Sequence, residues 1–126
     1  MPDLTPHQFS AERTKGQQRL LDADHLGIKR FLRLDAAAYE DATADGGLDA
    51  PTKELLGLVA SAVLRCDDCI RYHIEQCIRL GLTKKQVEDA MHVALVVGGS
   101  IVVPHARRAL LYLDAFAEQQ AYRREP

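Results

Sequence analysis

Two cysteines and a histidine stand close together near the middle of the chain, in the stretch RCDDCIRYH that runs from Arg65 to His73. Cys66 and Cys69 are three residues apart, and His73 follows Cys69 by four. On a helix these spacings put both thiols on nearly the same face, about 5 Å apart, with the imidazole leaning over Cys69. A dithiol at that separation can form a disulfide, and an adjacent imidazole can accept the thiol proton.

Three kinds of site fit these residues, and their spacing alone does not decide between them. In a redox site, Cys69 would attack a peroxide or a disulfide, and Cys66 would then close the disulfide. In a structural region, the cysteines would simply be packed in the core. In a metal site, the two thiols and His73 would need a fourth ligand, because structural zinc usually has four. That fourth ligand would have to come from Glu54, His92, His105 or another subunit.

The neighbours of the pair influence its chemistry. Asp67 and Asp68 are favourable in the first turn of a helix that has Cys66 as its N-cap, but their charges oppose formation of a thiolate. Cys77 lies about two turns beyond Cys69, which is too far for it to join the disulfide. We therefore expect Cys77 to be a core cysteine.

The composition restricts the class of protein. The chain has 126 residues and a formal net charge of -2, with acidic and basic residues interleaved. This pattern predicts neither a nucleic-acid partner nor a membrane-surface partner, because both require clustered Lys and Arg. The chain has three cysteines, an odd number, and it starts with MPDLTPHQFS, which lacks the features of a secretory signal. We therefore expect a cytoplasmic protein rather than a disulfide scaffold.

The longest apolar stretch, MHVALVVGGSIVVPHA, covers residues 91–106. Two glycines, a serine and a proline interrupt it, and a membrane span needs roughly 20 apolar residues. We expect it to form a buried helix pair or a subunit interface, with His92 and His105 packed there.

Capping patterns and apolar periodicity predict about six helices and almost no strand. The first expected helix starts at Thr5–Gln8 and continues over 10–23. Four more are expected over 28–38, 50–65, 66–81 and 83–99. The last is expected to begin within 100–104 and to run through 116. The third is apolar around most of its circumference, so we expect it to be largely buried. The prediction is an all-α, single-domain helical bundle over 1–126, with N-terminal helices in 5–45, a CxxC core region in 50–113 and a frayed polar tail in 120–126.

The motif E(x11)CxxCxxxH, formed by Glu54, Cys66, Cys69 and His73, resembles the signature of the AhpD-like group of the carboxymuconolactone decarboxylase family. The segment LGLTKKQVEDAMHVALVVGG also resembles a run of that family, and the similarity covers residues 50–113. The resemblance implies an all-helical fold that completes its core as a homo-oligomer, commonly a trimer or a hexamer made of two trimers.

The resemblance also implies an activity. The implied activity is that of a thiol-dependent peroxidase or disulfide reductase. The substrate would be a small peroxide or disulfide, and an external dithiol would be the reductant. No cofactor or metal is expected. Cys69 would be the attacking thiol, Cys66 its resolving partner, and His73 and Glu54 would relay protons. The chain departs from the best-known peroxidase members at Asp68, where those members carry a histidine.

The role of Glu54 rests on the resemblance. In a simple hairpin folded at Arg65, Glu54 would face Cys77 rather than Cys66. Two other functions stay open: a non-catalytic metal-binding oligomeric module, and a carboxymuconolactone-decarboxylase-like enzyme acting on a small organic acid. The last would need an anion-binding arginine, for which the candidates are Arg65, Arg71 and Arg107.

Overall fold

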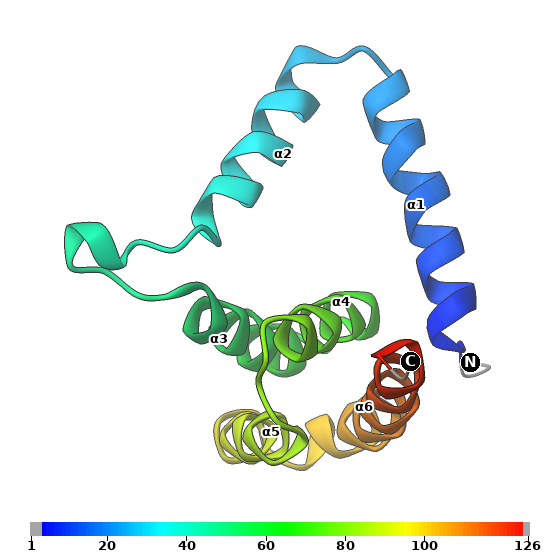
Figure 1. The fold of residues 1–126 in the computed structure, drawn as a ribbon, viewed down its shortest axis with the longest axis vertical. Helices are drawn as coiled ribbons and strands as arrows, with labels where there is room; N and C mark the ends of the chain where they lie inside the picture. Colours follow the sequence, from blue (N-terminus) through cyan, green and yellow to red (C-terminus); the bar gives the residue numbers. More distant parts are fainter. Residues whose placement is uncertain (1–3, 125–126) are drawn as a thin grey trace.

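The computed structural model describes residues 4–124, which form six α-helices and two short 3-10 helices and contain no strand (Figure 1). The elements are α1 (Pro6–Asp22), α2 (Leu26–Ala38), η1 (Thr43–Asp45), α3 (Ala50–Val63), α4 (Asp67–Arg79), α5 (Lys84–Gly98), η2 (Ser100–Val102) and α6 (Val103–Arg124). The all-α class and the number of helices predicted from the sequence are confirmed.

The helices form a body and an arm (Figure 1). α3, α4, α5 and α6 pack together as the body, whereas α1 and α2 extend away from it and return to α3 through η1. The start of α1 contacts α6, where Phe9 packs edge-to-face on Tyr112 with 5.8 Å between the ring centroids. α2 has no buried residue. The fold therefore leaves much of the arm without a partner within the described chain.

The core lies between the four helices of the body. α6 and α4 contribute most of its apolar residues, and in α4 Ile70, Ile74, Cys77 and Ile78 recur at helical spacing and are all buried. Complete burial of a large aliphatic side chain contributes roughly 1.5–3 kcal/mol. The largest fully buried side chains are Leu58, Ile70, Ile74, Cys77, Val87, Met91, Val102, Leu113 and Phe116. This packing fixes α4, and with it the CxxC motif, against α3 and α6.

Local sequence signals explain where the helices begin and end. Capping boxes join Thr5 to Gln8 at the start of α1 and Thr83 to Gln86 at the start of α5, as the sequence predicts. Gly81 follows α4 with a left-handed φ of 90°, which a glycine adopts without steric penalty.

Two expectations about the helices are wrong. α3 is not largely buried: Leu58 is inaccessible, but Leu56 is 56% exposed, and Leu64, the C-cap residue of α3, is 78% exposed. The body covers only one side of α3, and the arm does not cover the other. The expected frayed tail is helical as far as Arg124, because its Ala, Glu, Gln and Arg residues favour helix; residues 125–126 lie outside the described chain.

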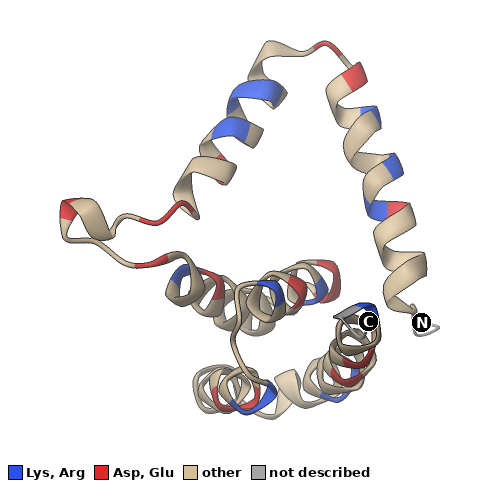
Figure 2. Ribbon diagram, viewed as in Figure 1, with Lys and Arg blue, Asp and Glu red and all other residues tan. Residues whose placement is uncertain are grey.

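Acidic and basic residues are mixed along the helices of both the body and the arm (Figure 2). Among the described residues, no helix is both long and apolar enough to cross a membrane.

Candidate active site

α3 and α4 are joined by a tight turn centred on Arg65. The Arg65 N–H donates to the Ala62 carbonyl and the Cys66 N–H donates to the Ser61 carbonyl, both at 3.0 Å. This is a Schellman motif, which usually has glycine at the left-handed position. Here Arg65 occupies that position with φ 60°, a conformation that costs a non-glycine residue about 1–2 kcal/mol. The turn brings Cys66 directly to the N-cap of α4.

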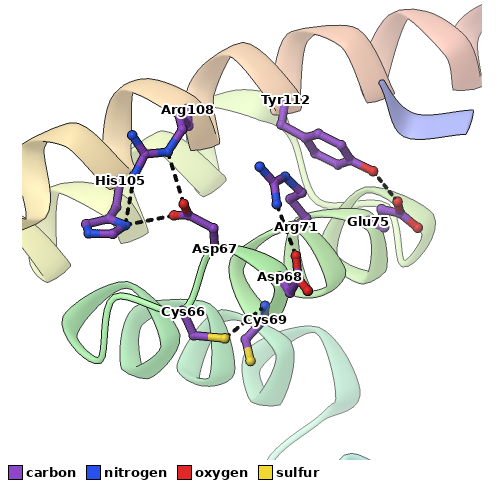
Figure 3. A network of polar contacts seen from close by, with 9 residues as sticks. All are labelled: Cys66, Asp67, Asp68, Cys69, Arg71, Glu75, His105, Arg108 and Tyr112. Carbon is purple, nitrogen blue, oxygen red and sulfur yellow. Dashed lines mark hydrogen bonds and ion pairs between the residues drawn. The ribbon is translucent and has the colours of Figure 1, made fainter. Parts of the chain in front are cut away.

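The two thiols differ in their surroundings. The Cys66 sulfur is half-buried and accepts the Cys69 N–H at 3.4 Å, whereas Cys69 is exposed (Figure 3). The pKa of Cys69 is raised to about 11, first by partial burial of its sulfur, then by a hydrogen bond with the Cys66 side chain and by the charges of Cys66 and Asp68. A thiol with so high a pKa is protonated at neutral pH and needs a base to become a thiolate.

Beyond the thiols, His73 and Glu54 form a buried pair. His73 Nδ1 lies 2.7 Å from Glu54 Oε2, and the residues are 7% and 4% exposed. A carboxylate only accepts, so Nδ1 carries the proton and Nε2 is free to accept another. Nε2 lies 3.5 Å from the Tyr39 hydroxyl. Glu54 lies close enough to Cys77 for its charge to act on that thiol, as a simple hairpin predicts, but its hydrogen bond is to His73, one turn earlier on α4.

α3 passes close to this pair at Gly57. A Cβ on Gly57 would lie 2.6 Å from His73 Cε1 and 2.8 Å from the Tyr39 oxygen, closer than real Cβ contacts. Glycine is therefore required for His73 and Tyr39 to lie where they do. The sequence analysis missed Gly57. Its only signal was a glycine inside an apolar helix, where it costs about 1 kcal/mol relative to alanine and often marks a close approach.

A cavity of about 530 Å³ opens between α4 and the arm. Side chains from α1, α2 and α4 surround it, together with the residue that ends α2. Its lining includes Arg13, Tyr39, Asp68, Cys69, Tyr72 and His73. The Arg13 guanidinium lies 4.3 Å above the Tyr72 ring. Cys69 and His73 thus share one cavity, although no hydrogen bond joins His73 to either thiol within the described chain.

On the other side of the motif, Asp67 is paired with α6 (Figure 3). Its carboxylate accepts from His105 Nδ1 at 2.7 Å and from Arg108 Nε at 3.0 Å. Burial acts to raise the pKa of Asp67, but the hydrogen bonds from His105 and Arg108 outweigh it and lower the pKa below its usual value. The sequence analysis did not find this cluster, because 38 and 41 residues separate its members. Its only signal was the HxxR spacing, which puts both side chains on one face of α6.

Asp68 has a different partner. It is exposed and pairs at 3.1 Å with Arg71, whose side chain is 5% exposed. Figure 3 also shows Tyr112 donating to the buried Glu75, further along α4. Asp67 pairs with Arg108 and Asp68 pairs with Arg71, so both aspartates between the cysteines have an arginine partner.

Cys77 is buried, as predicted, and its pKa is raised to about 12, mainly by burial and then by the charge of Glu54. Among residues 4–124, no group of three or more His, Cys, Asp or Glu side chains is arranged to hold a metal ion. His92 is not packed within this chain but is exposed on α5, 4.0 Å from Asp89.

A model of the carboxymuconolactone decarboxylase family matches residues 29–112 of this chain. An uncharacterized protein of Cupriavidus necator is 35% identical over 74 residues, which are 59% of this chain and 66% of that protein. An alkyl hydroperoxide reductase AhpD of Rhodospirillum centenum is 30% identical over 87 residues, which are 68% of this chain and 47% of that protein. The matches thus span about two thirds and about half of the length of these curated relatives.

The structure is also similar to the crystal structure of a carboxymuconolactone decarboxylase family protein of Thermotoga maritima. The TM-score is 0.84 and the sequence identity 44%, over 93% of this chain and 96% of that chain. That protein is described as having a possible part in an antioxidative response. The similarity thus covers the arm as well as the body.

Proposed function

Because the chain belongs to the carboxymuconolactone decarboxylase family, we propose that it is a thiol-dependent oxidoreductase that reduces a small peroxide or disulfide. The observation that carries this proposal is that Cys69 and His73 line one cavity, while Glu54 accepts a hydrogen bond from Nδ1 of His73. The AhpD relative and the antioxidative description of the Thermotoga maritima protein support the same class of reaction.

In the first step, His73 Nε2 accepts the proton of the Cys69 thiol. The thiolate attacks the terminal oxygen of a peroxide ROOH, so that an S–O bond forms while the O–O bond breaks. The alkoxide takes the proton from His73 and leaves as ROH, and Cys69 becomes a sulfenic acid. Glu54 stabilises the imidazolium that exists between these two transfers.

In the second step, the Cys66 thiolate attacks the sulfur of the Cys69 sulfenic acid. The disulfide forms, and hydroxide leaves and becomes water with the proton that Cys66 released. An external dithiol then reduces the disulfide through a mixed disulfide and is itself oxidised. With a disulfide substrate, Cys69 forms the mixed disulfide and Cys66 displaces the second thiol. Since the cycle starts from reduced thiols, we propose a cytoplasmic location.

The raised pKa of Cys69 explains why His73 is needed. A thiol with a pKa of about 11 has only about one part in 10⁴ in the thiolate form at pH 7. Proton transfer to a positioned base contributes typically 10²–10⁴-fold, which can offset much of this deficit. The positions of Glu54, Gly57 and Tyr39 are consistent with this role, because each of them contacts or borders the His73 ring.

We also propose that the chain works as a homo-oligomer, a trimer or a hexamer. α2 has no buried residue, although Leu26, Phe31 and Leu34 are apolar. On the body, Leu64 and Val96 are more than 70% exposed. Large exposed apolar patches usually mark interaction surfaces. Native mass spectrometry would test this, and a monomer at micromolar concentration would contradict it.

A second candidate, action on a small organic acid, has one supporting observation. Arg13 lines the cavity and offers a cation to a carboxylate, a role for which Arg65, Arg71 and Arg107 were the sequence candidates. Asp35 and Asp68 line the same cavity and oppose an anion. We therefore prefer the redox function.

The experiment that tests the redox function is mass spectrometry of the reduced chain before and after one equivalent of peroxide. We expect a loss of two mass units, mapped to Cys66 and Cys69, with Cys77 still a free thiol. A dithiol added afterwards should restore the starting mass. If the mass is unchanged, or if the oxidation maps to Cys77, the redox function is wrong.

A further inference from the structure

The proposed cycle leaves one problem unsolved, which concerns the acidity of the resolving thiol. Cys66 must be a thiolate to attack the Cys69 sulfenic acid. It lies at the N-terminus of α4, where free N–H groups and the helix dipole favour an anion. However, Asp67 and Asp68 follow it directly, and each carboxylate opposes a second negative charge nearby.

We propose that Arg108 and His105 of α6 pair with Asp67 in order to position the first turn of α4 and to keep Cys66 ready to ionise for the resolving step. They act as positioning residues, since they lie outside the cavity and act only through Asp67. The step that they serve rests on the proposed redox function, but their effect on Cys66 does not depend on it.

The geometry ties Cys66 to two neighbouring helices. Its N–H donates to the Ser61 carbonyl of α3 at 3.0 Å, so α3 fixes its backbone. The next residue, Asp67, is fixed to α6 by both carboxylate oxygens, one to His105 and one to Arg108. The Cys66 sulfur in turn accepts the Cys69 N–H. Cys66 therefore sits where α3, α4 and α6 are joined by polar contacts.

The burial of the Asp67 cluster makes its charges effective. The side chains of Asp67, His105 and Arg108 are 16%, 19% and 32% exposed, so water and salt screen them less than an exposed pair. Without Arg108, only His105 would remain to compensate the charge of Asp67, the residue that follows Cys66. The charged groups at this end of α4 come from the turn, from α4 and from α6: Arg65, Asp67, Asp68, Arg71, His105 and Arg108.

A purely structural role and an electrostatic role predict different results. If the cluster only holds the turn in place, then removal of either partner should disturb Cys66 in the same direction. If charge matters, the two single variants should have opposite effects. Arg108→Gln leaves the negative charge of Asp67 and disfavours the thiolate, whereas Asp67→Asn leaves the positive charge of Arg108 and favours it.

The test is the rate at which iodoacetamide, a neutral reagent, alkylates Cys66 in the reduced full-length chain across a range of pH. Fragmentation of the tryptic peptide 66–71 separates Cys66 from Cys69. For Arg108→Gln we expect the profile to move to higher pH, with a rate at pH 7 about three- to tenfold lower. For Asp67→Asn we expect a shift to lower pH, and for the double variant a profile close to that of the original chain.

Arg107→Gln is the matched control, because Arg107 is the adjacent, exposed arginine of α6 and forms no ion pair within residues 4–124. Shifts in the same direction for both single variants, or shifts no larger than that of Arg107→Gln, would overturn the proposal. If Arg108→Gln does not fold, Asp67→Asn decides: slower alkylation or no change overturns it. Alkylation needs no peroxide turnover, so a chain that is inert to peroxide would contradict the redox function without affecting this result.

Discussion

The same kind of turn precedes and follows α4, but the two ends of the helix have opposite environments. Before α4, a Schellman motif has Arg65 at its left-handed position, with φ 60°. After α4, an equivalent motif has Gly81 there, with φ 90°, and the Leu82 N–H donates to the Cys77 carbonyl at 3.0 Å. The first end carries two accessible cysteines and paired charges, whereas the second carries the fully buried Cys77.

This difference separates two ways in which a thiol loses acidity. Burial raises the pKa of Cys77 to about 12, and Cys77 does not line the cavity that contains His73. Partial burial raises the pKa of Cys69 to about 11, but Cys69 lines a cavity that also contains His73. A raised thiol pKa thus accompanies a packed cysteine at one end and, in the proposed cycle, a base-dependent nucleophile at the other. The surroundings of each thiol, rather than the shift of its pKa, distinguish Cys69 from Cys77.

The largest expected effect compares Cys69→Ser with Cys77→Ser. Cys69→Ser should reduce dithiol-dependent peroxide consumption to the uncatalysed background, because the attacking sulfur is lost. Cys77→Ser should keep the activity but lower the free energy of unfolding by about 1–3 kcal/mol, because it buries a hydroxyl among apolar groups. Coupled assays and urea unfolding measure both. Full activity in Cys69→Ser would remove the distinction between the two ends.

A smaller effect is expected for Gly57→Ala, which should displace His73 without altering a thiol. The added methyl would lie 2.6 Å from His73 Cε1, so the imidazole must move. We expect turnover to fall about 10- to 100-fold, since a shift of about 1 Å can cost about 10²-fold. The control is Gly81→Ala, because Gly81 lies outside the cavity and a Cβ there meets no atom within 4 Å. Equal turnover in the two variants would argue against His73 as the base.

The smallest effect concerns the two turns themselves. Gly81→Ala forces a side chain into the left-handed region and should destabilise the chain by about 1 kcal/mol. Arg65→Gly relieves that strain but increases the entropy of the unfolded chain, so we expect a change within about 0.5 kcal/mol. Both changes can be measured by urea unfolding. A large destabilisation by Arg65→Gly would mean that the arginine side chain itself stabilises the turn.

Local signals in the sequence predicted much of the fold. Thr5, Thr83 and Gly81 have cap geometries that depend only on residues within one or two turns, and all three were predicted correctly. Burial was harder to predict, because the apolar residues of α3 fit a fully buried helix equally well. Leu56 and Leu64 are exposed because the arm extends away from α3 instead of covering it.

The sequence by itself determined that Cys66 and Cys69 share the first turn of a helix and that His73 follows one turn later, because helical periodicity fixes such distances. Only the tertiary structure decided that Glu54 meets His73, that Gly57 makes room for it, and that α6 supplies partners for Asp67. These contacts depend on the crossing of helices whose residues are up to 41 positions apart. The side chains of the body set that crossing jointly, and no short stretch of sequence contains it.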